Sequence, residues 1–184
     1  MKEHRLELPL KDEDLKKLKI GDVVYLTGYL YTARDAAHKR IKNTLAEGGE
    51  PPVDFDGETI FYAGPCPTKP GRVMGSIAPT TSLRMDTYVE MTFKLGMKAM
   101  IGKGDRSDYV ADLCDKYNGV YLLGIGGASA MISESVKTCD VIAYEDLGTE
   151  SIKRLYVEDL YTIVGIDTEG NVFQESQIEK YKKN

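Results

Sequence analysis

Three basic side chains are placed where this sequence could carry chemistry. Arg34, Arg84 and Lys103 each lie at a predicted junction between a strand and a helix, and the hydroxyls of Thr81 and Ser82 are close to Arg84 in the sequence. A cation at the start of a helix is locally unfavourable, because the helix dipole is already positive there. A bound anion would offset this repulsion, and guanidinium groups suit carboxylates and phosphates. The spacing therefore predicts a site for a small polyanion, either a dicarboxylate or a phosphorylated ligand.

The stretch 75–86 is central to this pattern, and its arginine also has a simpler interpretation. Pro79 cannot continue a strand, so the chain is expected to turn there into a helix. An exposed Arg84 that bends back to Asp86 or Glu90 would need no ligand, and this stretch alone does not separate the two interpretations. The recurrence of the same arrangement at the other two junctions favours the ligand.

Hydrophobic periodicity and turn residues divide the chain into strands and helices. Strands are predicted at 5–8, 23–31, 59–63, 72–77, 97–101, 119–125, 139–144, 152–157 and 161–167, and helices at 12–18, 33–47, 81–95, 105–118 and from 174 onwards. The predicted helix N-caps are Thr32, Thr81 or Ser82, and Asp105 or Ser107. Strands that alternate with helices indicate an α/β fold, in which ligands bind beyond the carboxyl ends of the strands.

Composition and charge exclude several classes of protein. The chain has 184 residues, of which 42% are hydrophobic and 29% charged, as expected for one globular domain spanning residues 1–184. Its net charge of −5 argues against a nucleic-acid surface, which is usually basic. There is no apolar run long enough to span a membrane and no signal-peptide core, so a cytoplasmic location is expected.

Several residues that resemble functional signals are better explained by structure. Cys66, Cys114 and Cys139 are far apart and form no Cys-x-x-Cys pair, so they predict neither a disulfide framework nor a metal site in this chain. Cys66 lies in a Pro-rich loop and is interpreted as a packing or turn residue. His38 is interpreted as a surface or capping histidine. The glycines that follow Gly124 lack the spacing and the lysine of a phosphate-binding loop.

Four ordered motifs carry a resemblance to a known family. They are Thr32-Ala-Arg-Asp-Ala-Ala-His-Lys-Arg, Tyr62-Ala-Gly-Pro-Cys-Pro, Pro79-Thr-Thr-Ser-Leu-Arg-Met-Asp and Ile101-Gly-Lys-Gly. In this order they resemble the class I fumarate hydratase family, and more closely its separate β subunit, a form shared with L(+)-tartrate dehydratase. One departure is Ala78, which stands where the family usually has glycine.

The resemblance implies a fold, a reaction and a division of labour between two subunits. The fold would be a swivelling β/β/α domain, and the reaction the reversible hydration of fumarate to malate. A [4Fe–4S] cluster with an open iron would be held by the partner α subunit, with no metal ligand in this chain, in an α2β2 assembly. By the same resemblance Thr80 is the catalytic base, and Arg34, Arg84 and Lys103 bind the carboxylates of a small dicarboxylate substrate.

Two other functions stay open at the level of the sequence. An L(+)-tartrate dehydratase β subunit would need the same cations, because tartrate carries the same two carboxylates as malate and one more hydroxyl. A non-catalytic module for dicarboxylate binding or for assembly is the alternative from another class. A threonine hydroxyl is a weak base without a neighbouring group to manage its proton, and the sequence shows none beside Thr80.

Overall fold

The computed structural model describes residues 1–68, 70–124 and 129–181. Its strands are β1 (Glu3–Glu7), β2 (Val23–Thr32), β3 (Thr59–Phe61), β4 (Ala99–Gly102), β5 (Val120–Gly124), β6 (Val136–Ala143) and β7 (Ile152–Ile166). Its α-helices are α1 (Asp12–Leu15), α2 (Asp35–Ala46), α3 (Asp86–Lys94), α4 (Tyr109–Tyr117), α5 (Ser129–Ser135) and α6 (Phe173–Tyr181), with 3-10 helices η1 (Ser82–Met85) and η2 (Glu145–Glu150). The α/β class predicted from the sequence is confirmed.

Seven strands form one sheet, and five of them close into a barrel-like arrangement. The order is β1-β2-β3-β4-β5-β7-β6, and an additional pairing between β2 and β7 closes the ring. Strands β2 to β5 are parallel neighbours, whereas β7 runs antiparallel to both β2 and β5. Strand β1 extends the sheet beside β2, and β6 pairs only with β7 among the described strands.

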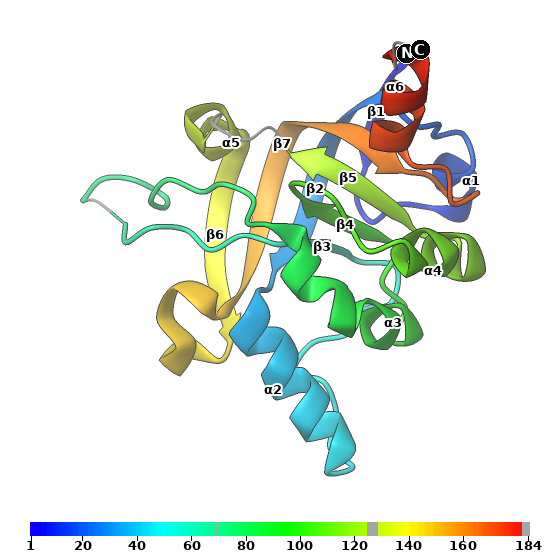
Figure 1. Cartoon of the computed structure of the whole chain (residues 1–184). Coiled ribbons are helices and arrows are strands. Elements are labelled where there is room, and N and C mark those ends of the chain that lie inside the picture. The colour runs from blue at the N-terminus through cyan, green and yellow to red at the C-terminus, as the bar shows by residue number, and fades with distance from the viewer. Residues whose placement is uncertain (69, 125–128, 182–184) are drawn as a thin grey trace.

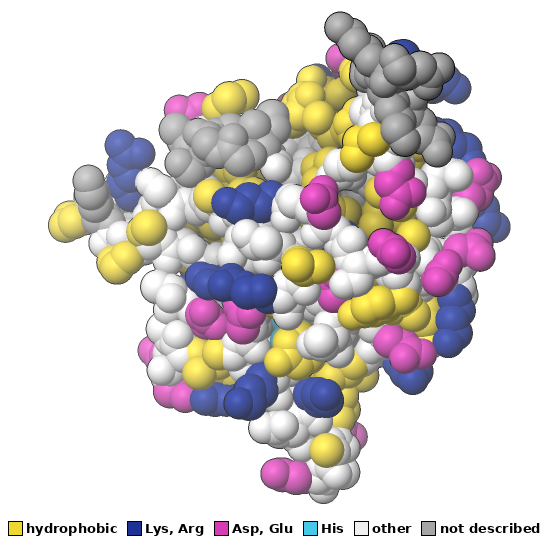
Figure 2. Space-filling view, viewed as in Figure 1, with side chains coloured by type: hydrophobic (Ala, Val, Ile, Leu, Met, Phe, Trp, Pro, Cys, Tyr) yellow, Lys and Arg dark blue, Asp and Glu magenta, His cyan; other side chains and the backbone are white. Residues whose placement is uncertain are grey.

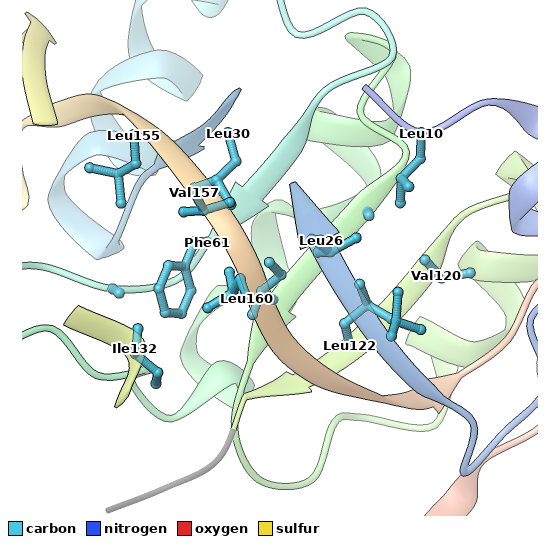
Figure 3. Close-up of a cluster of buried hydrophobic side chains, with 14 of the residues drawn as sticks. Leu10, Leu26, Leu30, Phe61, Val120, Leu122, Ile132, Leu155, Val157 and Leu160 are labelled. Atoms are coloured by element: carbon cyan, nitrogen blue, oxygen red, sulfur yellow. The ribbon is translucent and has the colours of Figure 1, made fainter. Parts of the chain in front are cut away.

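The barrel interior is filled by one cluster of apolar side chains. Because successive side chains of a strand point to opposite faces, alternate residues of each strand enter this core. Leu26, Leu122, Leu155 and Val157 all belong to it, and none of them is exposed. Figure 3 shows these side chains converging from β2, β5 and β7.

A second apolar cluster lies between the barrel and three helices. The intervening strand residues, such as Met100 and Tyr121, pack there against Ile41 of α2, Val89 of α3 and Val110 of α4. Figure 1 shows α2, α3 and α4 together on one side of the sheet. No helix of the described residues has the length and apolar character needed to cross a membrane.

Two predicted strand assignments are wrong. The predicted strand at 72–77 is irregular, and the described segments 64–68 and 70–78 instead form an arm beside β6 (Figure 1). The separate strands predicted at 152–157 and 161–167 are one 15-residue strand, β7. Its apolar pattern is interrupted at the exposed residues Glu158 and Asp159, which the sequence suggests as a break. Asp159 has a positive φ of 49°, and its N–H is bound by the Thr27 hydroxyl, so the strand continues past it.

Candidate active site

The parallel strands bring the predicted basic residues to one edge of the barrel. Neighbouring parallel strands end on the same side, so the carboxyl ends of β2, β3, β4 and β5 share this edge. Arg34 follows β2 after one intervening residue, and Lys103 follows β4 directly. This is the edge at which α/β sheets usually bind their ligands.

Thr80 reaches the same edge because its segment is inserted between the extensions of β3 and β4. Pro79 pairs with Ala63 beyond β3, and Thr81 pairs with Lys103 beyond β4. The Thr80 N–H donates to the carbonyl oxygen of Tyr62 at 2.7 Å. The threonine is therefore held by backbone pairing on both sides, although no regular strand precedes it.

Arg84 lies against the Thr80 hydroxyl. Its Nη2 donates to Thr80 Oγ1 at 2.8 Å and lies 3.4 Å from Asp35 Oδ2. The arginine pairs with Asp35, the first residue of α2, and not with Asp86 or Glu90 as the simpler interpretation held. A guanidinium that donates to a hydroxyl oxygen stabilises negative charge developing on that oxygen. Arg84 is thus a neighbouring group that can stabilise charge on the Thr80 hydroxyl, and the sequence alone did not reveal it.

Arg34 forms an ion pair with a residue that is distant in the sequence. Its Nη2 lies 3.3 Å from Glu150 Oε1, and Glu150 Oε2 accepts the N–H of Ala36 at 2.9 Å. The Arg34 Nε is buried and has no hydrogen-bond partner among the described residues. Figure 2 shows dark-blue basic side chains directly beside magenta acidic ones on the face that carries α2 and α3. A buried donor without a partner has hydrogen-bonding capacity that an incoming carboxylate could use.

Lys103 is exposed, like Arg84, but differs from the two arginines in its partners. Its ammonium forms no ion pair with any described side chain, while its backbone is tightly held. The Lys103 N–H donates to Ser82 Oγ at 3.0 Å, and the Ser82 N–H donates to the Lys103 carbonyl oxygen at 3.0 Å. The structure therefore brings Thr80 and Arg84 into direct contact. Lys103 joins them through Thr81 and Ser82, and Arg34 joins them through the adjacent residue Asp35.

The helix caps at these junctions differ from the predicted ones. Arg34 itself occupies the N-cap of α2, and Asp108 occupies that of α4. Thr32 belongs to β2, where its buried hydroxyl accepts the N–H of Lys153. Thr81 precedes η1 without a side-chain cap, and Ser82 uses its hydroxyl for Lys103 instead. These hydroxyls are engaged by neighbouring strands, which local sequence rules cannot reveal.

The prediction of a surface role for His38 is wrong. Its side chain is fully buried against the rings of Tyr62 and Tyr88, 5.6 and 5.5 Å away between centroids. Burial lowers the pKa of His38 to about 4, so the ring is neutral near pH 7. Its Nδ1 lies 2.8 Å from the Arg34 carbonyl oxygen, and a carbonyl only accepts, so Nδ1 carries the proton. His38 thus fixes the backbone from which Arg34 extends.

The sequence reasoning missed the acidic and hydroxylic partners of the site. The sequence assigns no role at the site to Asp35, and it predicts Ser82 only as a possible helix cap. Glu150 is 116 residues away from Arg34, so no local spacing connects them. Only the resemblance of whole motifs could have drawn attention to Ser82 and Asp35, since both lie within motifs that were recognised.

The cysteines do not supply a set of ligands for an iron–sulfur cluster. Cys114 is buried in α4, where burial raises the pKa of its thiol to about 12. Cys139 is half-buried in β6 and Cys66 is exposed on the arm. Within residues 1–68, 70–124 and 129–181, no three His, Cys, Asp or Glu side chains are grouped so that they could hold a metal ion.

Comparison with known proteins places this geometry in a family. The model of the fumarase C-terminus matches residues 1–177. The chain belongs to the fumarase C-terminus family. It is 36% identical over 183 residues to the class I anaerobic fumarate hydratase of Escherichia coli K12, which covers 97% of this chain and 33% of that enzyme. It is 37% identical over 161 residues to fumarate hydratase 2 of Leishmania major, covering 86% of this chain and 28% of that protein.

A separate subunit is also among the similar members of the fumarase C-terminus family. The L(+)-tartrate dehydratase subunit beta of Escherichia coli K12 is 36% identical over 172 residues, covering 90% of this chain and 84% of that subunit. In contrast, the chain spans about a third of the length of the fumarate hydratases that it matches. The fumarase C-terminus unit therefore occurs both within longer chains and as a chain of nearly this length.

Proposed function

We propose that this chain is the β subunit of a two-subunit hydro-lyase that adds water reversibly to fumarate to give malate. The observation that carries the proposal is the contact of Arg84 with the Thr80 hydroxyl, at the barrel edge that also bears Arg34 and Lys103. Membership of the fumarase C-terminus family supports the reaction class, and the high coverage of a named beta subunit supports a partner α subunit.

The three cations provide positive charge for the two carboxylates of a four-carbon dicarboxylate. Arg34 and Arg84 each share an internal carboxylate, at 3.3 and 3.4 Å, distances that are long for a charge-assisted hydrogen bond. Both guanidinium groups are partly exposed, so a substrate carboxylate can add to or replace these loose contacts. Lys103 provides a third positive charge without an internal partner among the described residues.

Thr80 is proposed to transfer the proton at carbon. In the hydration direction its hydroxyl proton goes to one alkene carbon of fumarate, and the hydroxide of a water molecule adds to the other. The alkoxide left on Thr80 is stabilised by the hydrogen bond from Arg84 Nη2, and the proton that the water loses is returned to Thr80 through solvent. In the dehydration direction the same alkoxide removes the proton next to a carboxylate whose developing charge the cations stabilise.

Lewis-acid chemistry at the substrate hydroxyl is assigned to a [4Fe–4S] cluster in the α subunit, since the described residues of this chain do not form a ligand set for one. The α2β2 assembly and the swivelling β/β/α fold remain predictions from the family resemblance. Light scattering of the purified complex tests the assembly.

L(+)-tartrate is the second candidate substrate, because a tartrate dehydratase subunit beta is similar to this chain over most of both lengths. It requires the same carboxylate contacts and differs by one hydroxyl. The ratio of the two activities in one preparation decides between fumarate and tartrate.

The test is anaerobic co-expression with the α subunit, followed by assays of fumarate hydration and tartrate dehydration. Arg84→Ala is expected to reduce fumarate turnover about a hundred- to a thousandfold, in line with the loss of one stabilising donor. Arg5→Ala is the matched control, because Arg5 is also an exposed arginine in an ion pair but extends from β1 onto the ring of Tyr25. Full activity of the Arg84 variant would refute the site assignment.

A further inference from the structure

A buried ion pair lies directly behind the candidate active site. Arg106 Nε donates to Asp86 Oδ1 at 2.6 Å, and both side chains are only 2% exposed. The second carboxylate oxygen of Asp86 accepts the N–H of Ser107 at 2.7 Å. Asp86 opens α3, whereas Arg106 and Ser107 lie in the loop before α4. The pair therefore ties together the two segments that follow Thr80 and Lys103.

The ion pair continues into a set of aromatic and hydroxyl contacts. The Arg106 guanidinium carbon is 4.6 Å from the ring centroid of Tyr121 and 5.5 Å from that of Tyr62. The phenolic oxygen of Tyr121 lies 3.0 Å from Ser82 Oγ and 3.1 Å from the carbonyl oxygen of Gly104. Ser82 Oγ in turn accepts the N–H of Lys103.

These contacts supply a constraint that the backbone alone does not. The Thr80–Arg84 turn meets the strand-end residue Lys103 through one isolated bridge, from Thr81, and not through a continuous ladder. The Ser82 side chain adds a hydrogen bond from the Lys103 N–H, and Tyr121 anchors Ser82 from β5. Ser82 and Tyr121 are both buried, so neither is available to contact a substrate at the exposed edge.

We propose that Asp86, Arg106, Tyr121 and Ser82 are positioning residues, which set Lys103 at a fixed distance from Thr80 and Arg84. The proposal rests on the proposed function, because it assigns these four residues to the same catalytic edge. Misplacement of reacting groups by about 1 Å can reduce a rate about a hundredfold, so a network of this kind affects turnover without touching the substrate.

A positioning role for Tyr121 and a role in proton transfer differ in their effects on the pH dependence of kcat. Burial raises the pKa of Tyr121 to about 12, so the phenol is neutral across the range in which the enzyme would be assayed. A phenol that donated a proton to the substrate would shift the pH dependence of kcat when it was removed. A phenol that only positions Ser82 would lower kcat and leave the shape of that profile unchanged.

The first experiment compares Tyr121→Phe and Ser82→Ala in the complex with the α subunit. Tyr121→Phe keeps the ring over Arg106 and removes one oxygen, and Tyr117→Phe is its control because that hydroxyl contacts Glu90 between α3 and α4. We expect kcat for fumarate to fall about tenfold or more in both test variants, with an unchanged pH profile and with wild-type values in the control. An unchanged kcat, or a displaced pH profile in Tyr121→Phe, would overturn the proposal.

The second experiment measures hydrogen exchange of the Lys103 amide in the purified chain. Ser82→Ala removes its acceptor, and the loss of one hydrogen bond predicts exchange about fivefold faster, whereas Tyr117→Phe should leave the rate unchanged. If the Lys103 amide exchanged as slowly in Ser82→Ala as in the wild type, the proposal would be overturned even if turnover fell. If the wild-type complex neither hydrated fumarate nor dehydrated tartrate, the proposed function would fail, while the exchange rates would still decide whether the network holds Lys103.

Discussion

His38 illustrates how a single buried residue makes the stability of the fold depend on pH. The ring is enclosed by Tyr62 and Tyr88 and holds the Arg34 carbonyl oxygen through Nδ1. Its pKa falls from 6.5 to about 4 because burial disfavours the charged form. In the unfolded chain the same ring regains its ordinary pKa and takes up a proton below pH 6.5.

The expected consequence is a loss of stability in mild acid. Above pH 6.5 His38 is neutral in both states and has no effect, whereas between pH 6.5 and 4 only the unfolded state is protonated. The free energy of unfolding should therefore fall by up to about 3 kcal/mol over this range on account of His38. Urea unfolding at several pH values measures it, and His38→Phe should show a flatter dependence than the wild type.

The control for this measurement is His4→Phe, which removes the second of the two histidines, one that contacts Asp22 on the other side of the molecule. Parallel stability curves for wild type and His38→Phe would contradict the assignment.

The sequence did not predict that His38 lies in the core, because its burial depends on Tyr62 from the extension of β3 and on Tyr88 from α3. Partners from distant segments determine whether a polar residue of an amphipathic helix is buried.

At the scale of elements, the end of β4 depends on a close approach that only glycine permits. A Cβ built at Gly102 would lie 1.8 Å from Ser82 Oγ and 3.2 Å from the Tyr121 ring. Gly102→Ala should therefore destabilise the chain by about 1–3 kcal/mol, as overpacking in a tight core does. Equilibrium urea unfolding measures the loss.

Two variants separate this contact from other effects of an added methyl group. A Cβ added at Gly104 would have no neighbouring atom within 4 Å. Gly104→Ala should therefore lower the free energy of unfolding by about 1 kcal/mol, only because of the positive φ of 79° at this residue. Ser82→Ala removes the oxygen that a residue at position 102 would meet, so the double variant should be less destabilised than the sum of the two single variants. Strict additivity would show that Gly102 and Ser82 do not constrain each other.

The sequence predicts the strand-end residues of the candidate site better than the segment inserted between the strands. The junction residues Arg34 and Lys103 were placed correctly, because strand ends are marked by turn residues and parallel strands share an edge. The insertion of Thr80 between Ala63 and Lys103 was not predicted, since two isolated bridges leave no periodic pattern. The role of each site residue remains a prediction, and the experiments on Arg84, Tyr121 and Ser82 test it.

For the whole molecule, closure of the barrel by β7 explains why distant segments form one site. Strand β7 pairs with β2 over nearly the full length of β2 and also with β5 and β6. It thereby links the segment that carries Arg34 to the strand that carries Tyr121, and it follows η2, which carries Glu150. Hydrophobic periodicity predicted its two halves but could not reveal that one continuous strand closes the ring.

This closure predicts that the barrel unfolds as one cooperative unit. Leu155 of β7 is fully buried in the interior cluster, so Leu155→Ala should reduce the free energy of unfolding by about 2–5 kcal/mol through loss of packing and cavity formation. Ile142 of β6 is 44% exposed, and Ile142→Ala should change the free energy of unfolding by less than about 0.5 kcal/mol. Urea unfolding can be followed by circular dichroism and by tyrosine fluorescence, because the chain has 12 tyrosines and no tryptophan.

The two probes report on different parts of the closed structure. Circular dichroism follows all helices and strands, whereas the tyrosines include Tyr25, Tyr29, Tyr156 and Tyr161 on the outer face of the paired strands β2 and β7. If closure makes the barrel one unit, both probes should give the same midpoint in the wild type and should shift together in Leu155→Ala. Midpoints that separate in Leu155→Ala would mean that the β2–β7 seam opens before the rest of the sheet. In that case the positions of Arg34 and Lys103 would be set by separate parts of the molecule.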